Sequence, residues 1–358
     1  MWKNIVKWID IRIGLDDLVS TRLKNYLVPR DAGFFSTLGL VALVAFLVQV
    51  ISGILLIMYY TPHPDHAFTS VQQIMNEVPF GWLFRELHVV GANLLVLLLF
   101  LHLTNVFYMG RYKRPRDITW FTGGIALFII LGFCVTGHLL PWNQMSYWST
   151  TVITSFPTFI PGIGDKIAVF LRGGDYVSGV TLSRFFAFHV ALLPTCIVVF
   201  ITLHILLVRR MGFAPNKTDY ITKKEFSYEL HTDGMPFYPD FFSKQMVMTS
   251  LFFAVVFFIM TFMPDTFLPV GAHVQADPLS TPLFIKPPFY FLPAYQILRF
   301  IPNEFLGISL VLIFCLLFLF WPFIDNNEER NILKRPILLS IFFGTLILWV
   351  VLTIMGGY

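Results

Sequence analysis

The sequence predicts an all-α, polytopic membrane protein with seven transmembrane helices, four of which form a bundle around two stacked pairs of histidines. Of the 358 residues, 56% are hydrophobic and only 13% are charged, whereas a soluble domain has about 25% charged residues. Seven apolar stretches are long enough to cross about 30 Å of hydrocarbon. Four histidines lie within two of these stretches, as two pairs of closely matched spacing.

The predicted spans follow the apolar stretches, and the charged residues orient them. Residues 1–35 mix apolar and charged side chains, which predicts a helix at the membrane interface. The bundle is expected over 36–215 and a three-helix region over 216–358. Nineteen of the 25 lysines and arginines fall before the first span or in the second-to-third, fourth-to-fifth and sixth-to-seventh connections. The positive-inside rule therefore places the N-terminus in the cytoplasm and the C-terminus outside. The spans are 36–58, 82–108, 118–138, 184–208, 246–264, 304–323 and 336–355.

The two histidine pairs have the spacing of stacked metal ligands. His88 and His102 are 14 residues apart, and His189 and His204 are 15 apart. At about 100° per residue, both members of a pair lie on one side of their helix, about 21–22 Å apart along it. Both helices run inward, so His88 would face His189 near the outer surface and His102 would face His204 near the inner one.

Neutral imidazole is a good ligand for haem iron, so this arrangement predicts two non-covalent b-type haems, each held by two histidines. The alternative is four unrelated histidines, each hydrogen-bonded to a neighbour. The matched intervals and the cost of a histidine in hydrocarbon favour the ligands.

Four glycines repeat the histidine interval on the first and third spans. Gly39 and Gly53 are 14 residues apart, as are Gly123 and Gly137. Glycine allows a bulky flat group to approach a helix backbone closely. We therefore expect these positions to give clearance to two porphyrin faces, with ordinary small-residue packing between helices as the alternative.

The outer connections, residues 139–183 and 265–303, are rich in proline and aromatic residues and poor in charge. Long loops are usually functional, so we expect short interfacial helices that line an apolar pocket beside the outer haem; simple interfacial anchoring is the alternative.

The three cysteines form neither a CxxCH motif nor a metal-binding cluster. A net charge of +4, widely dispersed, gives no indication of nucleic-acid binding.

Five segments of the chain carry a family resemblance. From about residue 8 to the C-terminus the sequence resembles cytochrome b, the haem subunit of the quinol-oxidising cytochrome bc and bf complexes. Seven spans in one chain resemble a fused form of the bf arrangement. The 15-residue interval between His189 and His204 also resembles the bf-type members of the family. The segments are FLVQVISG (46–53), RELHVVGAN (85–93), GHLLPWNQMSYW (137–148), TLSRFFAFH (181–189) and PFYFLPAYQILRFIPN (288–303).

The resemblance implies an enzyme subunit that is active only within a complex. Quinol would be oxidised in the outer pocket, giving one electron to a Rieske iron–sulfur protein and one to the outer haem. The second electron would pass through the inner haem to quinone at an inner pocket, with protons released outside and taken up inside. A c-type cytochrome or an equivalent acceptor, a homodimeric complex and membrane lipids are the implied partners.

The resemblance also implies roles for individual residues. Arg85 and Arg184 would lie near the propionates of the outer haem. Arg209 and Lys244 are placed to serve the inner pocket or the inner propionates. The outer pocket would be formed by Pro287, Phe289 and Tyr290, with Trp142 and Tyr147 on the facing wall.

Departures from the family pattern are equally informative. Pro288 replaces the usual acidic residue of the outer motif, and His138 replaces a family tyrosine. An imidazole has an ordinary pKa of about 6.5, so we interpret His138 as the proton acceptor for quinol, with Tyr290 positioning it; Glu86 or His273 are the alternatives. The missing carboxylate favours menaquinone as the quinone.

Two further departures lie on the inner side. Asn105 replaces an inner arginine, and Thr37 replaces the cysteine that bf-type relatives use for an extra covalent haem. No thioether bond is therefore expected, while an additional non-covalent inner haem stays open.

Two other functions remain open. A dihaem membrane anchor that links another dehydrogenase to the quinone pool would use similar histidine pairs but would lack the LPW and PFY outer loops. A transporter with structural histidines would bind no haem.

Overall fold

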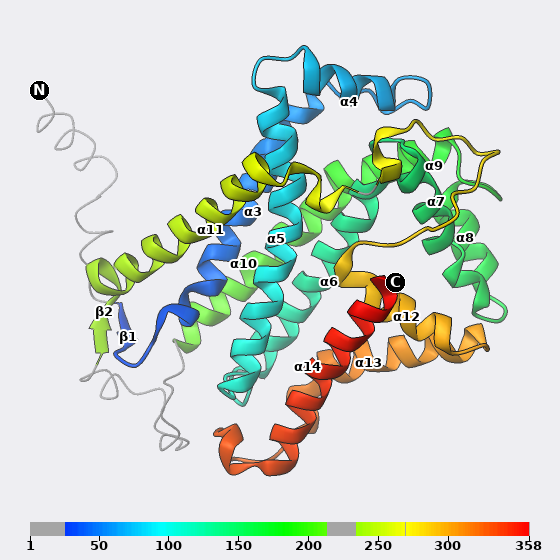
Figure 1. Ribbon diagram of the computed structural model, residues 1–358. Coiled ribbons are helices and arrows are strands. Elements are labelled where there is room, and N and C mark those ends of the chain that lie inside the picture. Colours follow the sequence, from blue (N-terminus) through cyan, green and yellow to red (C-terminus); the bar gives the residue numbers. More distant parts are fainter. Residues whose placement is uncertain (1–25, 213–233, 269, 358) are drawn as a thin grey trace, which may run out of the picture.

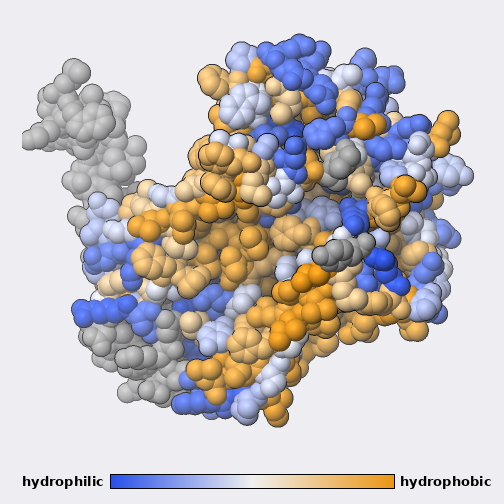
Figure 2. Space-filling model, in the orientation of Figure 1, coloured by the Kyte–Doolittle hydropathy of each residue, from blue (hydrophilic) through white to orange (hydrophobic). Residues whose placement is uncertain are grey.

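The computed structural model describes residues 26–212, 234–268 and 270–357, and its described part confirms the all-helical fold with seven helices long and apolar enough to cross a membrane. Five of these helices (Figure 1) lie within about two residues of the predicted spans, whereas the fourth and the fifth, Phe237–Phe262, begin earlier than predicted. Figure 2 shows an apolar belt across the visible face, with hydrophilic residues above and below it. The long helices are α3 (Leu38–Ile57), α5 (Gly81–Tyr108), α6 (Asp117–Leu139), α10 (Leu193–Met211), α11 (Phe242–Phe262), α13 (Glu304–Ile324) and α14 (Pro336–Gly357).

The fourth span is longer than its apolar stretch predicts and is not uniformly α-helical. It runs from Gly179 to Met211. Helix α9 (Gly179–Ala187) continues through a π-helical turn, η4 (Phe188–Leu192), into α10. Hydrogen bonds from i to i+5 let a π turn hold one more residue than an α turn.

The four helices α3, α5, α6 and α10 form the bundle. Helix α3 packs on α5 and α10 packs on α6. On α3, the buried residues Leu38, Val41, Ala42 and Ala45 follow the i, i+3, i+4, i+7 pattern of a helix with one packed face. They join residues of α5, α6 and α10 in one apolar core. The remaining long helices flank this bundle (Figure 1).

Short helices occupy the outer connections, as expected from their sequences. They are α7 (Gln144–Ile153), α8 (Gly164–Arg172) and α12 (Leu292–Phe300), with 3-10 turns η3 (Phe156–Phe159), η7 (Pro264–Phe267), η8 (Val270–His273) and η9 (Phe289–Phe291). Helix α7 begins with a capping box in which Asn143 and Ser146 exchange side-chain-to-backbone hydrogen bonds. Helix α4 (Ala67–Asn76), between α3 and α5, was not predicted.

A short strand pair joins two segments that are far apart in sequence. Strand β1 (Leu27–Pro29) pairs antiparallel with β2 (Gly234–Pro236), and Val28 lies opposite Met235. The turns η2 (Phe34–Thr37) and η6 (Phe237–Phe241) then lead into α3 and α11. Residues 1–25 of the predicted interfacial helix and the predicted boundary at 215/216 lie outside the described residues, while the rest of that predicted helix, 26–35, contains β1 and the start of η2 instead.

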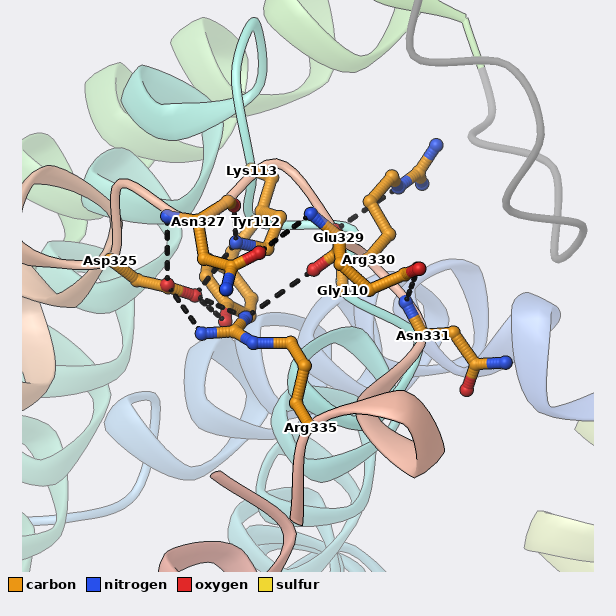
Figure 3. Close-up of polar contacts among 9 residues, drawn as sticks. All are labelled: Gly110, Tyr112, Lys113, Asp325, Asn327, Glu329, Arg330, Asn331 and Arg335. Carbon is orange, nitrogen blue, oxygen red and sulfur yellow. Dashed lines mark hydrogen bonds and ion pairs between the residues drawn. The ribbon is translucent and has the colours of Figure 1, made fainter. Parts of the chain in front are cut away.

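A buried ion cluster ties the bundle to the C-terminal region (Figure 3). The Asp325 carboxylate, at the end of α13, accepts hydrogen bonds from the Tyr112 hydroxyl at 2.5 Å and from Lys113 Nζ at 2.8 Å. Arg335 donates to both of its oxygens, at 2.8 and 2.6 Å. The side chains of Lys113, Asp325 and Arg335 are 7%, 5% and 14% exposed.

Ionisation of Asp325 is coupled to this cluster. Burial opposes the charged carboxylate, but the hydrogen bonds from Arg335, Lys113 and Tyr112 outweigh burial and hold the pKa of Asp325 below its ordinary value. A carboxyl whose pKa is lowered by folding stabilises the folded state above its ordinary pKa. This contribution is therefore fully present at neutral pH and is lost only as strongly acidic pH protonates Asp325.

Replacement of Asp325 tests the cluster. Asp325→Asn leaves two buried cations without their counter-charge, and removing one partner of a buried pair typically costs about 3–5 kcal/mol. We expect a clearly lower thermal unfolding temperature in detergent, whereas Lys334→Gln, at a side chain that is 60% exposed, should change stability by less than about 0.5 kcal/mol. Equal unfolding temperatures for the two variants would contradict this role.

Candidate functional site

The two histidines predicted to lie on the outer side, called the outer histidines, face one another across the bundle. His88 lies on α5, and His189 lies in the π turn η4. Their ring centroids are 6.2 Å apart and their planes are inclined by 72°. The π turn contains His189 and holds one extra residue, so it offsets the longer interval to His204. The two helices can therefore present their histidines in nearly the same register.

The inner histidines, His102 and His204, lie further along the same two helices. Each of the four histidines lies against one of the four predicted glycines. A Cβ atom built on Gly137 would lie 2.6 Å from Cε1 of His189, and one on Gly53 would lie 3.2 Å from Cε1 of His88. For the inner level, a Cβ on Gly123 would lie 2.9 Å from His204, and one on Gly39 would lie 3.0 Å from His102. The glycine interval thus matches the histidine interval because each glycine receives the edge of one imidazole.

Three of the four imidazoles are oriented by a hydroxyl group. Nδ1 of His88 lies 3.0 Å from Ser52 Oγ, Nδ1 of His189 lies 3.2 Å from Thr136 Oγ1, and Nδ1 of His204 lies 3.3 Å from Thr122 Oγ1. Sequence reasoning missed these residues. The signal was present, because each hydroxyl residue immediately precedes a glycine of the 14-residue repeat.

These hydroxyl groups act as acceptors toward the histidines. Ser52 Oγ donates to the Val48 carbonyl at 2.8 Å, and Thr136 Oγ1 donates to the Gly132 carbonyl at 2.9 Å. Thr122 Oγ1 likewise donates to a backbone carbonyl one turn earlier, at 3.0 Å. A hydroxyl has one proton to donate, so the facing Nδ1 carries the proton. Nε2 is then the nitrogen available to a metal.

The predicted cationic residues have defined partners. Arg85 forms a buried ion pair with Glu86, with 2.7 Å between Nη1 and Oε1. Arg184 donates to the Phe170 carbonyl and lies over the Phe170 ring.

On the inner side, the guanidinium of Arg209 lies 5.0 Å from the centroid of the Tyr26 ring. Lys244 Nζ donates to the Ala32 carbonyl at 2.8 Å. These contacts tie Arg209 and Lys244 to the segment that precedes α3.

An apolar cavity lies between the outer end of α6, the outer short helices and α13. Its volume is about 390 Å³. His138 Nε2 and Ser149 Oγ are both buried and have no hydrogen-bond partner within the described residues. Both residues line this cavity, which is otherwise mainly apolar, with Cys134, Pro287, Phe291 and Tyr295 among its walls. Sequence reasoning pointed to His138 and Pro287 but missed Ser149.

The other predicted outer-pocket residues lie outside the cavity lining. Tyr290 packs in the same apolar cluster as Cys134, and the Phe289 ring packs edge-on against Tyr290 with centroids 5.0 Å apart. The Tyr147 hydroxyl donates to the Val177 carbonyl at 3.2 Å. Its ring packs edge-on against Trp142. None of these four residues is among the residues that line the cavity.

The alternative proton acceptors lie elsewhere. Glu86 forms the ion pair with Arg85 described above, and His273 lies 3.4 Å from Asp265 at the exposed surface. Neither lines the cavity.

Comparisons with known proteins agree with this arrangement. The chain matches the family models described as Cytochrome b/b6/petB over residues 23–212 and Cytochrome b(C-terminal)/b6/petD over residues 275–358. Together these two models cover most of the chain. The chain is an integral membrane protein built on a helical bundle with paired histidines. The chain belongs to the cytochrome b family.

Individual relatives cover nearly the whole chain. It is 36% identical to cytochrome b of Rickettsia prowazekii (strain Madrid E), over 93% of this chain and 82% of that protein. It is 34% identical to cytochrome b of Rhodospirillum rubrum, over 96% and 83%. Among solved structures it is similar to a chain described as "Hyperthermophilic respiratory Complex III", with a TM-score of 0.92, 34% identity, and coverage of 99% of this chain and 91% of that one.

Family membership implies b-type haem, and the outer histidine pair fits it. With a metal–imidazole bond of about 2.0–2.1 Å and about 1.2 Å from nitrogen to ring centre, two imidazoles on one metal have centroids about 6.4 Å apart. The observed separation of 6.2 Å agrees. Nδ1 of His88 and of His189 is hydrogen-bonded to a hydroxyl, so Nε2 is the nitrogen that would bind the iron. The neighbouring glycines leave space for the imidazole edges.

Substitution of the glycines tests this fit. Gly137→Leu places a branched side chain where a Cβ alone would lie 2.6 Å from His189, and we expect loss of b-type haem absorbance in the reduced-minus-oxidised spectrum. Gly344→Leu is the matched control, because nothing lies within 4 Å of a Cβ at that helical glycine. Normal haem content in Gly137→Leu would contradict this role and favour the alternative, in which Gly137 only allows ordinary helix packing.

Proposed function

We propose that this chain is the cytochrome b subunit of a quinol oxidoreductase that works with a Rieske iron–sulfur protein. The observation that carries the proposal is the opposed pair of His88 and His189 at the same end of the bundle as an apolar cavity with two unpaired polar atoms. The second pair, His102 and His204, lies about 21–22 Å further along the helices, as their spacing requires. This layout supports electron transfer from an outer oxidation site to an inner reduction site.

The histidines determine the electron path. When bound, each b-type haem would supply a carrier of one electron at a time. His88 and His189 would hold the outer haem, and His102 and His204 the inner one, all through Nε2. Quinol oxidation releases two electrons, so the second electron needs a separate acceptor. A Rieske protein that passes electrons to a c-type cytochrome or an equivalent acceptor meets that need.

The cavity is suited to a flat apolar ring with polar substituents. Its walls are mainly apolar, and His138 Nε2 and Ser149 Oγ are the buried atoms that can bond a quinol hydroxyl. A neutral imidazole at the cavity wall is placed to accept a proton from the quinol. His138 therefore replaces the missing carboxylate of the Pro287–Tyr290 segment. Tyr290 packs in the same apolar cluster as Cys134, a residue of the cavity wall.

The assembly and its setting follow from the same proposal. We place the subunit in a homodimeric complex in the bacterial cytoplasmic membrane, with the N-terminus in the cytoplasm. Protons would leave on the outer side and enter on the inner side, which contributes to proton translocation. Menaquinone is the proposed quinone, with quinone reduction at an inner pocket. A dihaem membrane anchor is the second candidate, but the cavity formed by α7, α12 and the Pro287–Pro288 segment favours quinol oxidation.

The inner ligands provide the first test. His204→Ala should remove one of two b-type spectral components and block transfer across the membrane, while the outer component remains reducible by quinol. His63→Ala, at an outer side chain that is 57% exposed, is the control and should keep both components. Two intact components in His204→Ala would show that the pairing is wrong.

The pH dependence of turnover tests His138. A neutral imidazole accepts the proton, so the rate should fall as pH drops below its pKa. In His138→Phe with normal haem content, we expect at least a tenfold lower rate and loss of this acid limb, in line with the about 10²–10⁴-fold typical of acid–base groups. His273→Phe should behave as the unmodified protein. An unchanged rate and profile in His138→Phe would remove His138 from the mechanism.

Purification of the complex separates the two candidate functions. The proposed oxidoreductase should co-purify with a Rieske protein and reduce a c-type cytochrome with quinol. Isolation with another dehydrogenase, without an iron–sulfur Rieske signal, would instead establish the membrane anchor.

A further inference from the structure

The two histidine pairs differ in their hydrogen bonds. Both outer histidines have a hydroxyl acceptor at Nδ1, from Ser52 and Thr136. In the inner pair only His204 has one, from Thr122. Nδ1 of His102 is buried and has no hydrogen-bond partner in the part of the chain that the structure describes.

The sequence explains this difference. Each of the three hydroxyl residues immediately precedes a glycine of the 14-residue repeat, but the fourth glycine, Gly39, follows Leu38. Leu38 is buried and has no polar atom in its side chain. The sequence position that supplies a hydroxyl to the other three histidines therefore carries a hydrocarbon side chain in the case of His102.

A second acceptor is withdrawn from His102 as well. Nδ1 of His204 also contacts the Thr119 carbonyl at 2.9 Å, three residues before its hydroxyl partner. The backbone of Gln49 and of Phe133, at the same offset, likewise lies beside the outer histidines. The corresponding carbonyl for His102 is that of Phe35.

The Phe35 carbonyl has another donor. It accepts a hydrogen bond from Asn105 Nδ2 at 3.1 Å. Asn105 stands one helical turn after His102. Leu38 offers no hydroxyl and the Phe35 carbonyl bonds Asn105 rather than His102, so Nδ1 of His102 has no oxygen acceptor among the described residues.

Hydrogen bonding at Nδ1 changes the iron through the ring. An acceptor that draws on the Nδ1 proton makes the imidazole a more basic ligand. A more basic ligand favours the ferric state and lowers the midpoint potential, and second-shell hydrogen bonding is one of the protein's means of adjusting haem potential. Two ligands with acceptors would lower the potential more than one.

We propose that Ser52, Thr136 and Thr122 tune the haem potentials through these hydrogen bonds, and that Leu38 and Asn105 raise the potential of the inner haem by leaving Nδ1 of His102 without an acceptor. The inference rests on the proposed function, in that it assumes a haem between each histidine pair. Ser52, Thr136 and Thr122 are positioning residues, which hold the imidazoles and tune them without touching the iron. Leu38 is the residue that makes the inner site different.

Redox titration of the two b-type components in the purified complex tests the proposal. Ser52→Ala and Thr136→Val should each shift the outer component to a more positive midpoint potential and leave the inner one in place. Thr136→Ser, which keeps the hydroxyl, should restore the original value. Thr195→Val is the matched control, because Thr195 Oγ1 bonds only its own helix, at the Ala191 carbonyl, on an exposed position.

Gain of an acceptor gives the opposite test. Leu38→Thr should offer His102 a hydroxyl and shift the inner component to a more negative potential. Asn105→Leu, which releases the Phe35 carbonyl, should shift the potential of the inner component in the same direction. This variant replaces Leu38→Thr in the test if Leu38→Thr does not fold.

The outcomes separate this inference from the function on which it rests. Haem-loaded variants whose potentials match the unmodified protein and Thr195→Val would overturn the tuning role of these residues while leaving the proposed function intact. An unmodified complex that holds no haem would instead overturn the proposed function.

Discussion

The close approach of four imidazole rings to four helix backbones is the contact on which the rest of the structure depends. At Gly39, Gly53, Gly123 and Gly137 a Cβ atom would lie between 2.6 and 3.2 Å from a histidine carbon, which is too close at Gly123 and Gly137 and unusually tight at Gly39 and Gly53. Helices α3 and α6 can therefore pack beside α5 and η4–α10 only where they carry glycine. The interval between glycines must equal the interval between ligands, so the sequence repeats it on both helices.

The same contact accounts for two local features. The π turn at His189 holds the extra residue of the fourth span, so the longer histidine interval does not rotate His204 far from its partner. Residues directly before three of the glycines bring hydroxyl groups to Nδ1, which holds each ring edge-on to the backbone. The outer cavity and the cluster around Asp325 lie on either side of this framework. The cluster fixes α13, and α13 in turn forms one wall of the cavity.

Most of the architecture could be predicted from the sequence because hydrocarbon imposes strict rules. Apolar length located the seven spans, and helical periodicity paired His88 with His102 and His189 with His204. The 14-residue repeat found the four glycines, although their close neighbour proved to be the imidazole edge. The fourth span was predicted too short because Gly179–Arg184 is less apolar than the segment that follows it.

The remaining features depend on contacts between distant segments, which no local pattern encodes. The β1–β2 pair, Asp325 with Tyr112, and Ser149 facing the cavity each join residues from separate elements. Tyr290 was predicted from the family motif, but whether its side chain lines the cavity or packs in the cluster with Cys134 depends on the turn at η9. The hydroxyl partners could have been found, since Ser or Thr precedes three of the four glycines.

The haem stoichiometry of the unmodified protein tests the central claim most directly. Pyridine haemochrome analysis of the purified complex, combined with low-temperature electron paramagnetic resonance, would count the haems per chain and report their axial ligands. The account predicts two b-type haems per chain, each low-spin with two imidazole ligands. One haem per chain, or a high-spin iron with a single histidine, would contradict the paired arrangement.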